Sequence, residues 1–114
     1  MHKILVVEES KNLRFLYKLV LSKEGFDVST VSSKEAALEK LPEMDLVISD
    51  LTEPNENGCN YLNHYYKQND KLKVIINTGF PLKPNQSFHC QADAVLPKTS
   101  NVEQLTSLIR NVLT

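Results

Sequence analysis

The sequence predicts an α/β fold built on a parallel β-sheet. Strand-like apolar runs alternate along the chain with segments whose apolar residues recur every three or four positions, the spacing of one helix face. The strand-like runs are apolar almost throughout, which indicates strands buried on both faces. Right-handed crossovers between parallel strands place helices on both faces of such a sheet, so the two observations agree.

The chain begins with a strand followed by a helix. Residues 4–7 form an unbroken apolar run, and a helical pattern follows, with Ser10 placed to cap it and Gly25 to stop it. We expect the apolar stripe of this helix to lie in the core. The residues of the stripe are Leu13, Leu16, Tyr17, Val20 and Leu21.

A second strand–helix unit follows. Residues 26–31 predict a weaker strand, after which Ser32 and Glu35 stand in the spacing of a capping box. Pro42 closes the helix that this box begins, because a proline cannot continue it. The apolar positions of the helix are Ala36, Ala37, Leu38 and Leu41.

The second half of the chain repeats the alternation. Residues 45–51 and 73–77 predict two strands, and a turn-rich segment, "TEPNENG", separates the first of them from a helix at 59–67. The helix expected within 80–91 is short or irregular, because Pro81 and Pro84 interrupt it.

The chain ends with a short strand at 94–96 and an amphipathic helix, which is expected to pack on the core. The apolar stripe of that helix is Val102, Leu105, Leu108, Ile109 and Val112. The 114 residues, 41% of them hydrophobic, suit one domain over 1–114.

Five strands fit a doubly wound, flavodoxin-like sheet of order 2-1-3-4-5, in which functional groups gather beyond the carboxyl ends of the strands. Glu8, Glu9, Asp50, Thr78 and Lys98 all fall on that edge. We expect three carboxylates there to repel one another and to raise at least one pKa, unless a cation or a lysine offsets their charge. A hard divalent ion is the simplest remedy, and Mg²⁺ suits a site with few carboxylates.

The bulk properties exclude several other classes of function. A net charge of -1 and the lack of a basic, aromatic-interleaved patch argue against nucleic acid as a direct partner. The apolar runs are far shorter than the roughly 20 residues that span a bilayer, so we expect a cytoplasmic protein without a membrane contact. Cys59, Cys90 and the histidines show no zinc-ligand spacing.

Four motifs carry a family resemblance: "ILVVEES", "DLVISDLTEPNENG", "VIINTG" and "AVLPK" resemble the receiver domain of two-component response regulators, over essentially the whole chain. The resemblance implies that Glu8 and Glu9 hold Mg²⁺, together with Asp50 and the backbone carbonyl of Thr52. It implies that Asp50 accepts a phosphoryl group from a histidine kinase or phosphotransfer protein.

The resemblance also gives Thr78 and Lys98 roles beside the phosphoryl group. Lys98 neutralises charge on the transferred oxygens, and the Thr78 hydroxyl moves to bond one of them, which biases a two-state surface. The expected protein is therefore not an enzyme but a signalling domain that promotes its own aspartyl phosphorylation and dephosphorylation. We expect a monomer or weak dimer, either a stand-alone relay or a domain of a larger protein.

The sequence departs from the family in ways that leave an alternative open. Both members of the acidic pair are glutamate, where aspartate is commoner; Thr99 follows the lysine, and Val95 stands where an aromatic residue is frequent. A pseudo-receiver, a fixed protein-interaction module not regulated by phosphorylation, is the alternative.

Two enzyme classes on similar sheets fit less well. A haloacid dehalogenase-like phosphatase needs an acid two places after Asp50, where Thr52 stands. A flavodoxin needs a phosphate-binding loop after the first strand, but the acids at that place would repel the flavin phosphate.

Overall fold

The computed structural model describes residues 1–49, 56–78, 92–97 and 101–114, without the side chains of 56–61 and 78. The helix expected within 80–91 and the residues Asp50, Thr52 and Lys98 lie outside this description. The elements in chain order are β1 (Lys3–Val7), α1 (Lys11–Lys23), β2 (Asp27–Val31), α2 (Lys34–Leu38), the 3₁₀ helix η1 (Leu41–Glu43), β3 (Leu46–Ser49), α3 (Glu56–Gln68), β4 (Lys73–Thr78), β5 (Ala94–Pro97) and α4 (Val102–Leu113).

The strands form one five-stranded parallel sheet of order β2-β1-β3-β4-β5, as predicted. The predicted flavodoxin-like fold class is therefore confirmed. The register aligns the carboxyl ends of the central strands: Val7 pairs with Ser49, and Ser49 pairs with Ile76. At the other side of the sheet, Thr78 pairs with Pro97.

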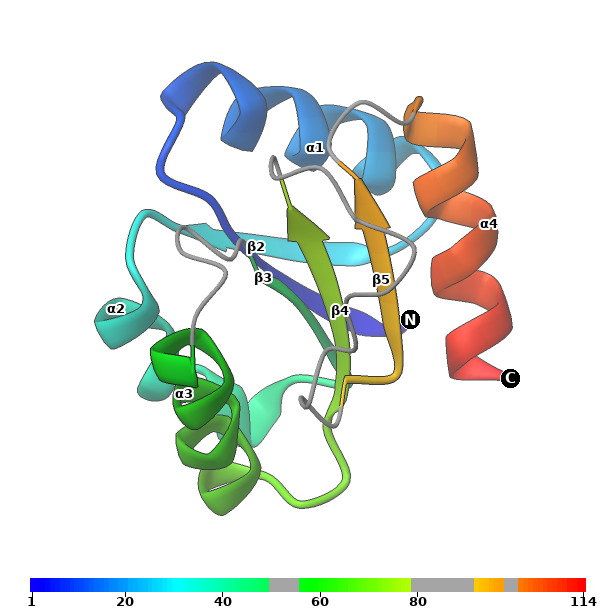
Figure 1. Ribbon diagram of the computed structural model, residues 1–114. Helices are drawn as coiled ribbons and strands as arrows, with labels where there is room; N and C mark the ends of the chain where they lie inside the picture. Colours follow the sequence, from blue (N-terminus) through cyan, green and yellow to red (C-terminus); the bar gives the residue numbers. More distant parts are fainter. Residues whose placement is uncertain (50–55, 79–91, 98–100) are drawn as a thin grey trace.

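Helices cover both faces of the sheet, α1 and α4 one face, α2 and α3 the other (Figure 1). Successive residues of β1 alternate between the two faces: Leu5 and Val7 belong to the apolar cluster under α2 and α3, whereas Ile4 and Val6 belong to the cluster under α1 and α4. All four are buried, which explains why the strand is apolar throughout. Burial of each such side chain contributes about 1.5–3 kcal/mol.

The predicted ends of α1 are confirmed. Ser10 is the N-cap, with its hydroxyl accepting a hydrogen bond from the Leu13 N–H at 3.4 Å. Gly25, with φ +95°, follows the helix in the left-handed region that favours glycine. The chain then turns directly into β2.

The predicted cap of α2 was wrong by one residue. Ser33, not Ser32, is the N-cap, and its hydroxyl accepts from the Ala36 N–H at 3.1 Å. Both serines have the same capping chemistry, and the extended backbone at Ser33 decides between them. Pro42 lies in η1 and not at the end of α2, which stops at Leu38.

The apolar stripe predicted for α1 is only partly in the core. Tyr17 and Leu21 are buried, whereas Leu16 is exposed. The exposed side of α1 also carries Phe15, 71% exposed, and Leu19, 45% exposed. The spacing of the stripe was correct, but it did not reveal that α1 has more apolar side chains than its inner face can bury.

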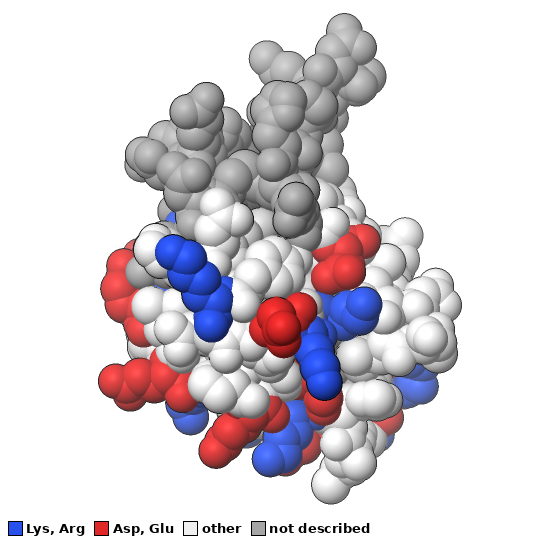
Figure 2. Space-filling model, turned by 90° about the horizontal axis from the view of Figure 1, so that it is seen from below, with Lys and Arg blue, Asp and Glu red and all other residues white. Residues whose placement is uncertain are grey.

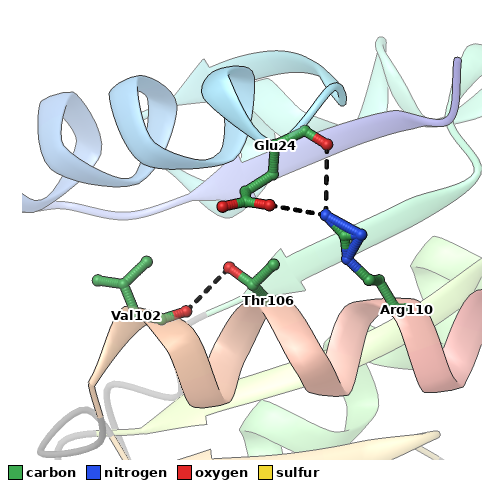
Figure 3. Close-up of polar contacts among 4 residues, drawn as sticks. All are labelled: Glu24, Val102, Thr106 and Arg110. Carbon is green, nitrogen blue, oxygen red and sulfur yellow. Dashed lines mark hydrogen bonds and ion pairs between the residues drawn. The ribbon is translucent and has the colours of Figure 1, made fainter.

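Helix α4 is fixed to the end of α1 by a charged contact. The Arg110 guanidinium donates to the Glu24 carboxylate at 2.8 Å and to its backbone carbonyl at 3.4 Å (Figure 3). The same guanidinium carbon lies 5.4 Å from the centroid of the Phe26 ring. Within α4 the Thr106 hydroxyl donates to the Val102 carbonyl at 2.9 Å. The Arg110 contacts join α4 to the segment after α1, on the face of the sheet where Leu105 and Ile109 are buried.

Charges of both signs are interspersed on the face of the molecule seen in Figure 2.

A buried polar pair joins α1 to β4. The Asn77 amide donates to the Tyr17 hydroxyl at 3.0 Å, and the two residues are 4% and 6% exposed. We expect Tyr17→Phe to lower the free energy of unfolding by about 1–3 kcal/mol, because it leaves the Asn77 amide buried without its partner.

The matched test is the double variant Tyr17→Phe/Asn77→Leu. Removing both polar groups is expected to cost much less than the sum of the two single variants, measured by urea denaturation. Additive losses would show that the hydrogen bond does not contribute to stability.

Candidate functional site

The carboxyl edge of the sheet brings the ends of β1 and β3 together. Val7 and Ser49 are paired neighbours and are the last residues of their strands. Glu8 follows Val7 directly, and Asp50 follows Ser49 in the sequence. Thr78, which was expected to follow the fourth strand, is the last residue of β4, two strands from β1.

The structure therefore places three of the predicted site residues on this edge: Glu8, Glu9 and the backbone of Thr78. The predicted positions of Asp50, Thr52 and Lys98 lie outside the described residues and stay predictions.

The two members of the acidic pair have different environments. Glu8 is only 3% exposed, whereas Glu9 is exposed. The Glu8 backbone N–H donates to the Val31 carbonyl at 3.1 Å, which extends the pairing of β1 with β2 by one residue. Its carboxylate accepts from the Ser10 N–H at 3.1 Å. A carboxylate this deeply buried requires compensating polar partners, so its position is strongly constrained.

An arginine that the sequence analysis did not single out holds the backbone of the acidic pair. One terminal nitrogen of Arg14, on the first turn of α1, donates to the carbonyls of both Glu8 and Glu9 at 2.9 Å. Helical side chains lean toward the N-terminus of their helix, which lets Arg14 reach back to the segment before α1. A basic residue in the first turn of a helix that follows an acidic pair is the sequence signal that could have revealed the contact.

The acidic pair fits a magnesium site by the chemistry of its donors. Mg²⁺ takes oxygen ligands and is usually bound by one or two carboxylates while it keeps several waters. Glu8 and Glu9 supply two carboxylates at adjacent positions, one buried and one open to solvent. Within the described ranges no three acidic, histidine or cysteine side chains gather, and Asp50, the third predicted carboxylate, lies outside them.

Two buried polar pairs lie beneath this edge, one on each face of the sheet. The Ser49 hydroxyl at the end of β3 lies 3.4 Å from the Tyr65 hydroxyl of α3, and Asn77 of β4 bonds Tyr17 of α1. Tyr65 is buried in the core. Both polar strand ends thus have partners on helices, which ties the edge to the two helical layers.

The opposite, amino edge of the sheet carries a separate hollow of about 450 Å³. Lys73 at the start of β4, Asp93 just before β5 and Tyr66 of α3 are among its lining residues. Burial raises the pKa of the Tyr66 phenol, and the Asp93 carboxylate raises that pKa further. The sequence motifs put no chemistry at this edge.

Comparison with known proteins identifies the family. A family model described as the response regulator receiver domain matches residues 4–110. The chain belongs to the response regulator receiver domain family. This agrees with the resemblance carried by its four motifs, and with the sheet order and aligned edge described above.

Among curated proteins the receiver domain is similar to regulators that are about twice its length. It is 34% identical over 116 residues to the transcriptional regulatory protein CpxR of Escherichia coli K12, covering 99% of this chain and 50% of CpxR. It is 32% identical over 115 residues to the CpxR homolog of Haemophilus influenzae, covering 99% of this chain and 51% of that protein. The chain thus spans about half the length of these relatives.

Solved receiver structures share its fold. A CheY-like receiver domain protein of Methanospirillum hungatei gives a TM-score of 0.85 at 26% identity, covering 99% of this chain and 94% of that chain. A chain from the crystal structure of the histidine kinase ThkA in complex with the response regulator protein TrrA gives 0.83 at 30% identity, covering 100% of both. TrrA of Thermotoga maritima in complex with Mg²⁺–BeF gives 0.82 at 29% identity, covering 98% of this chain and 99% of that chain.

Among the described helices of this receiver domain, none is long and apolar enough to span a membrane.

Proposed function

We propose that this receiver domain, with residues 1–114 as a single domain, accepts a phosphoryl group on Asp50 and signals by changing what it binds. The pairing of Val7 with Ser49 carries the proposal, because the residue that follows each of them in the sequence is acidic, Glu8 after Val7 and Asp50 after Ser49. Family membership supports it, and so does the complex of the similar protein TrrA with Mg²⁺–BeF.

The proposed chemistry is mostly positioning and electrostatics. An Asp50 carboxylate oxygen attacks the phosphorus in line, a new P–O bond forms, and the bond to the donor breaks and leaves its electron pair on the donor. The Lys98 ammonium offsets negative charge on the transferred oxygens. Glu8, Glu9, Asp50 and the Thr52 carbonyl would hold Mg²⁺, which supplies positive charge beside those oxygens.

The proposed output is a change of binding and not turnover. Phosphorylation of Asp50 adds acceptor oxygens, and the Thr78 hydroxyl donates to one of them. Attack of water on the same phosphorus then returns the carboxylate and inorganic phosphate, so the domain resets its own signal.

We propose a histidine kinase or phosphotransfer protein as the donor, and the exposed side of α1 as one surface that it contacts. The similar protein TrrA has been crystallised with the histidine kinase ThkA. Phe15, Leu16 and Leu19 form an apolar surface on α1, the helix that begins just after the acidic pair. A protein that delivers a phosphoryl group to the carboxyl edge therefore meets α1.

Incubation with acetyl phosphate and Mg²⁺ is expected to add one phosphoryl group to the protein, and Asp50→Asn is expected to abolish the gain, because an amide is a poor nucleophile. Intact-mass spectrometry measures this directly. Asp70→Asn, which removes an exposed carboxylate just before β4, is the matched control and keeps full labelling. An unlabelled wild-type protein would favour the pseudo-receiver alternative.

Mg²⁺ is expected to raise the free energy of unfolding, by about 2.7 kcal/mol at a concentration one hundred times its dissociation constant. Glu9→Gln is expected to remove most of this gain, because it removes a carboxylate ligand. Thermal unfolding with and without Mg²⁺ measures the effect. The control is Glu39→Gln, an exposed glutamate at the end of α2, and an equal loss in both variants would contradict the assignment.

Phe15→Ala and Leu19→Ala are expected to slow phosphoryl transfer from a cognate kinase at least several-fold, while labelling by acetyl phosphate is unchanged. The measurement is transfer of radiolabelled phosphate from a panel of autophosphorylated histidine kinases, with the wild type identifying the cognate one. Equal transfer to wild type and variants would exclude this surface of α1 from the kinase contact.

A further inference from the structure

Arg14 lies beside two glutamates but bonds their backbone and not their carboxylates. Its terminal nitrogen donates to the backbone carbonyls of Glu8 and Glu9, both at 2.9 Å. Within the described part of the chain it forms no ion pair with either carboxylate. Arg14 therefore binds the main chain of the acidic pair and does not compete with a cation for the carboxylate oxygens.

The two hydrogen bonds fix the direction of two consecutive peptide groups. A single nitrogen that binds both carbonyls requires them to converge on one point, which restricts the backbone dihedral angles at Glu9. The Glu8 N–H is already held by the Val31 carbonyl, and the Ser10 N–H by the Glu8 carboxylate. Arg14 thus completes a set of contacts that fixes the backbone from 8 to 10, and so sets where both carboxylates project.

The same guanidinium has an opposing electrostatic effect on a metal ion. Its positive charge lies close to the site and repels a divalent cation, although solvent and salt weaken this repulsion. A purely electrostatic role therefore predicts that removal of the Arg14 charge strengthens Mg²⁺ binding. A positioning role predicts the reverse, because flexible carboxylates must be ordered when the ion binds. The two roles therefore predict opposite changes in Mg²⁺ affinity when Arg14 is replaced by a neutral residue.

We infer that Arg14 is a positioning residue for the metal site, which orients the carboxylates of Glu8 and Glu9 through their backbone carbonyls. The inference rests on the proposed function, since it assigns the metal to this pair. In this inference Arg14, on α1, contacts neither the ion nor the phosphoryl group, and it raises metal affinity only through the backbone of the two ligands.

The test compares Mg²⁺ affinity, by isothermal titration calorimetry, in the wild type and three variants. Arg14→Met keeps an unbranched apolar stem but removes the donors, and it is expected to weaken binding about tenfold, the lower end for residues that orient metal ligands. Arg14→Lys keeps the charge and a terminal donor group, and it is expected to restore part of the affinity. Unchanged or tighter binding by Arg14→Met would overturn the inference.

Lys11→Met is the matched control for charge. Lys11 is an exposed residue at the start of α1. Lys11→Met removes one positive charge, as Arg14→Met does, but it removes no hydrogen bond within the described structure. It is expected to bind Mg²⁺ as tightly as the wild type or slightly more tightly. Weakening equal to that of Arg14→Met would show that charge, not positioning, is responsible, and would also overturn the inference.

A metal-free measurement separates this inference from the proposed function. In EDTA, Arg14→Met is expected to shift the backbone amide resonances of residues 8–10 and to speed their hydrogen exchange, while the core amides of β3 and β4 keep their wild-type values and show that the protein is folded. Unchanged amides at 8–10 would overturn the backbone contact itself. A wild type that binds no Mg²⁺ would overturn the metal role together with the proposed function, and these amides would still decide whether Arg14 holds the segment.

Discussion

The parallel register between β1 and β3 is the constraint on which the rest of the site depends. It pairs Val7 with Ser49, the last residues of β1 and β3, so the two neighbouring strands end at the same level. Burial on both faces fixes this register, since Leu5 and Val6 pack on opposite helical layers. A slip of one residue would turn every side chain of β1 toward the wrong layer. The core thereby positions the acidic edge.

The polar groups at that edge are tied to helices on both faces of the sheet. Asn77 bonds Tyr17 on α1, Ser49 lies within hydrogen-bonding distance of Tyr65 on α3, and Arg14 on α1 binds the main chain after β1. Helix α1 therefore contacts both the acidic pair and β4, and its outer side carries apolar residues. Helix α1 thus links the carboxyl edge to the exposed apolar side chains of Phe15, Leu16 and Leu19.

The sheet order and the place of Glu8 directly after β1 followed from the sequence, because both depend on strong, local patterns: unbroken apolar runs, caps such as Ser10, and a carboxylate directly after a strand. The contacts of Arg14 and Asn77 could not be predicted from the sequence, because they join residues on different elements and depend on tertiary packing. The exposure of Phe15 could not be predicted either, since periodicity shows which residues share a helix face but not how much of that face the rest of the protein covers. The cap at Ser33 depended on backbone conformation alone.

The most direct test of the account is to locate a bound divalent ion on the whole chain. Substoichiometric Mn²⁺ broadens the amide resonances nearest to it, and Mg²⁺ in excess should reverse the effect by competition. The account predicts broadening centred on Glu8, Glu9 and Asp50, at the carboxyl edge. Broadening centred on the amino edge, around Asp70 and Asp93, or spread evenly over exposed carboxylates, would contradict it.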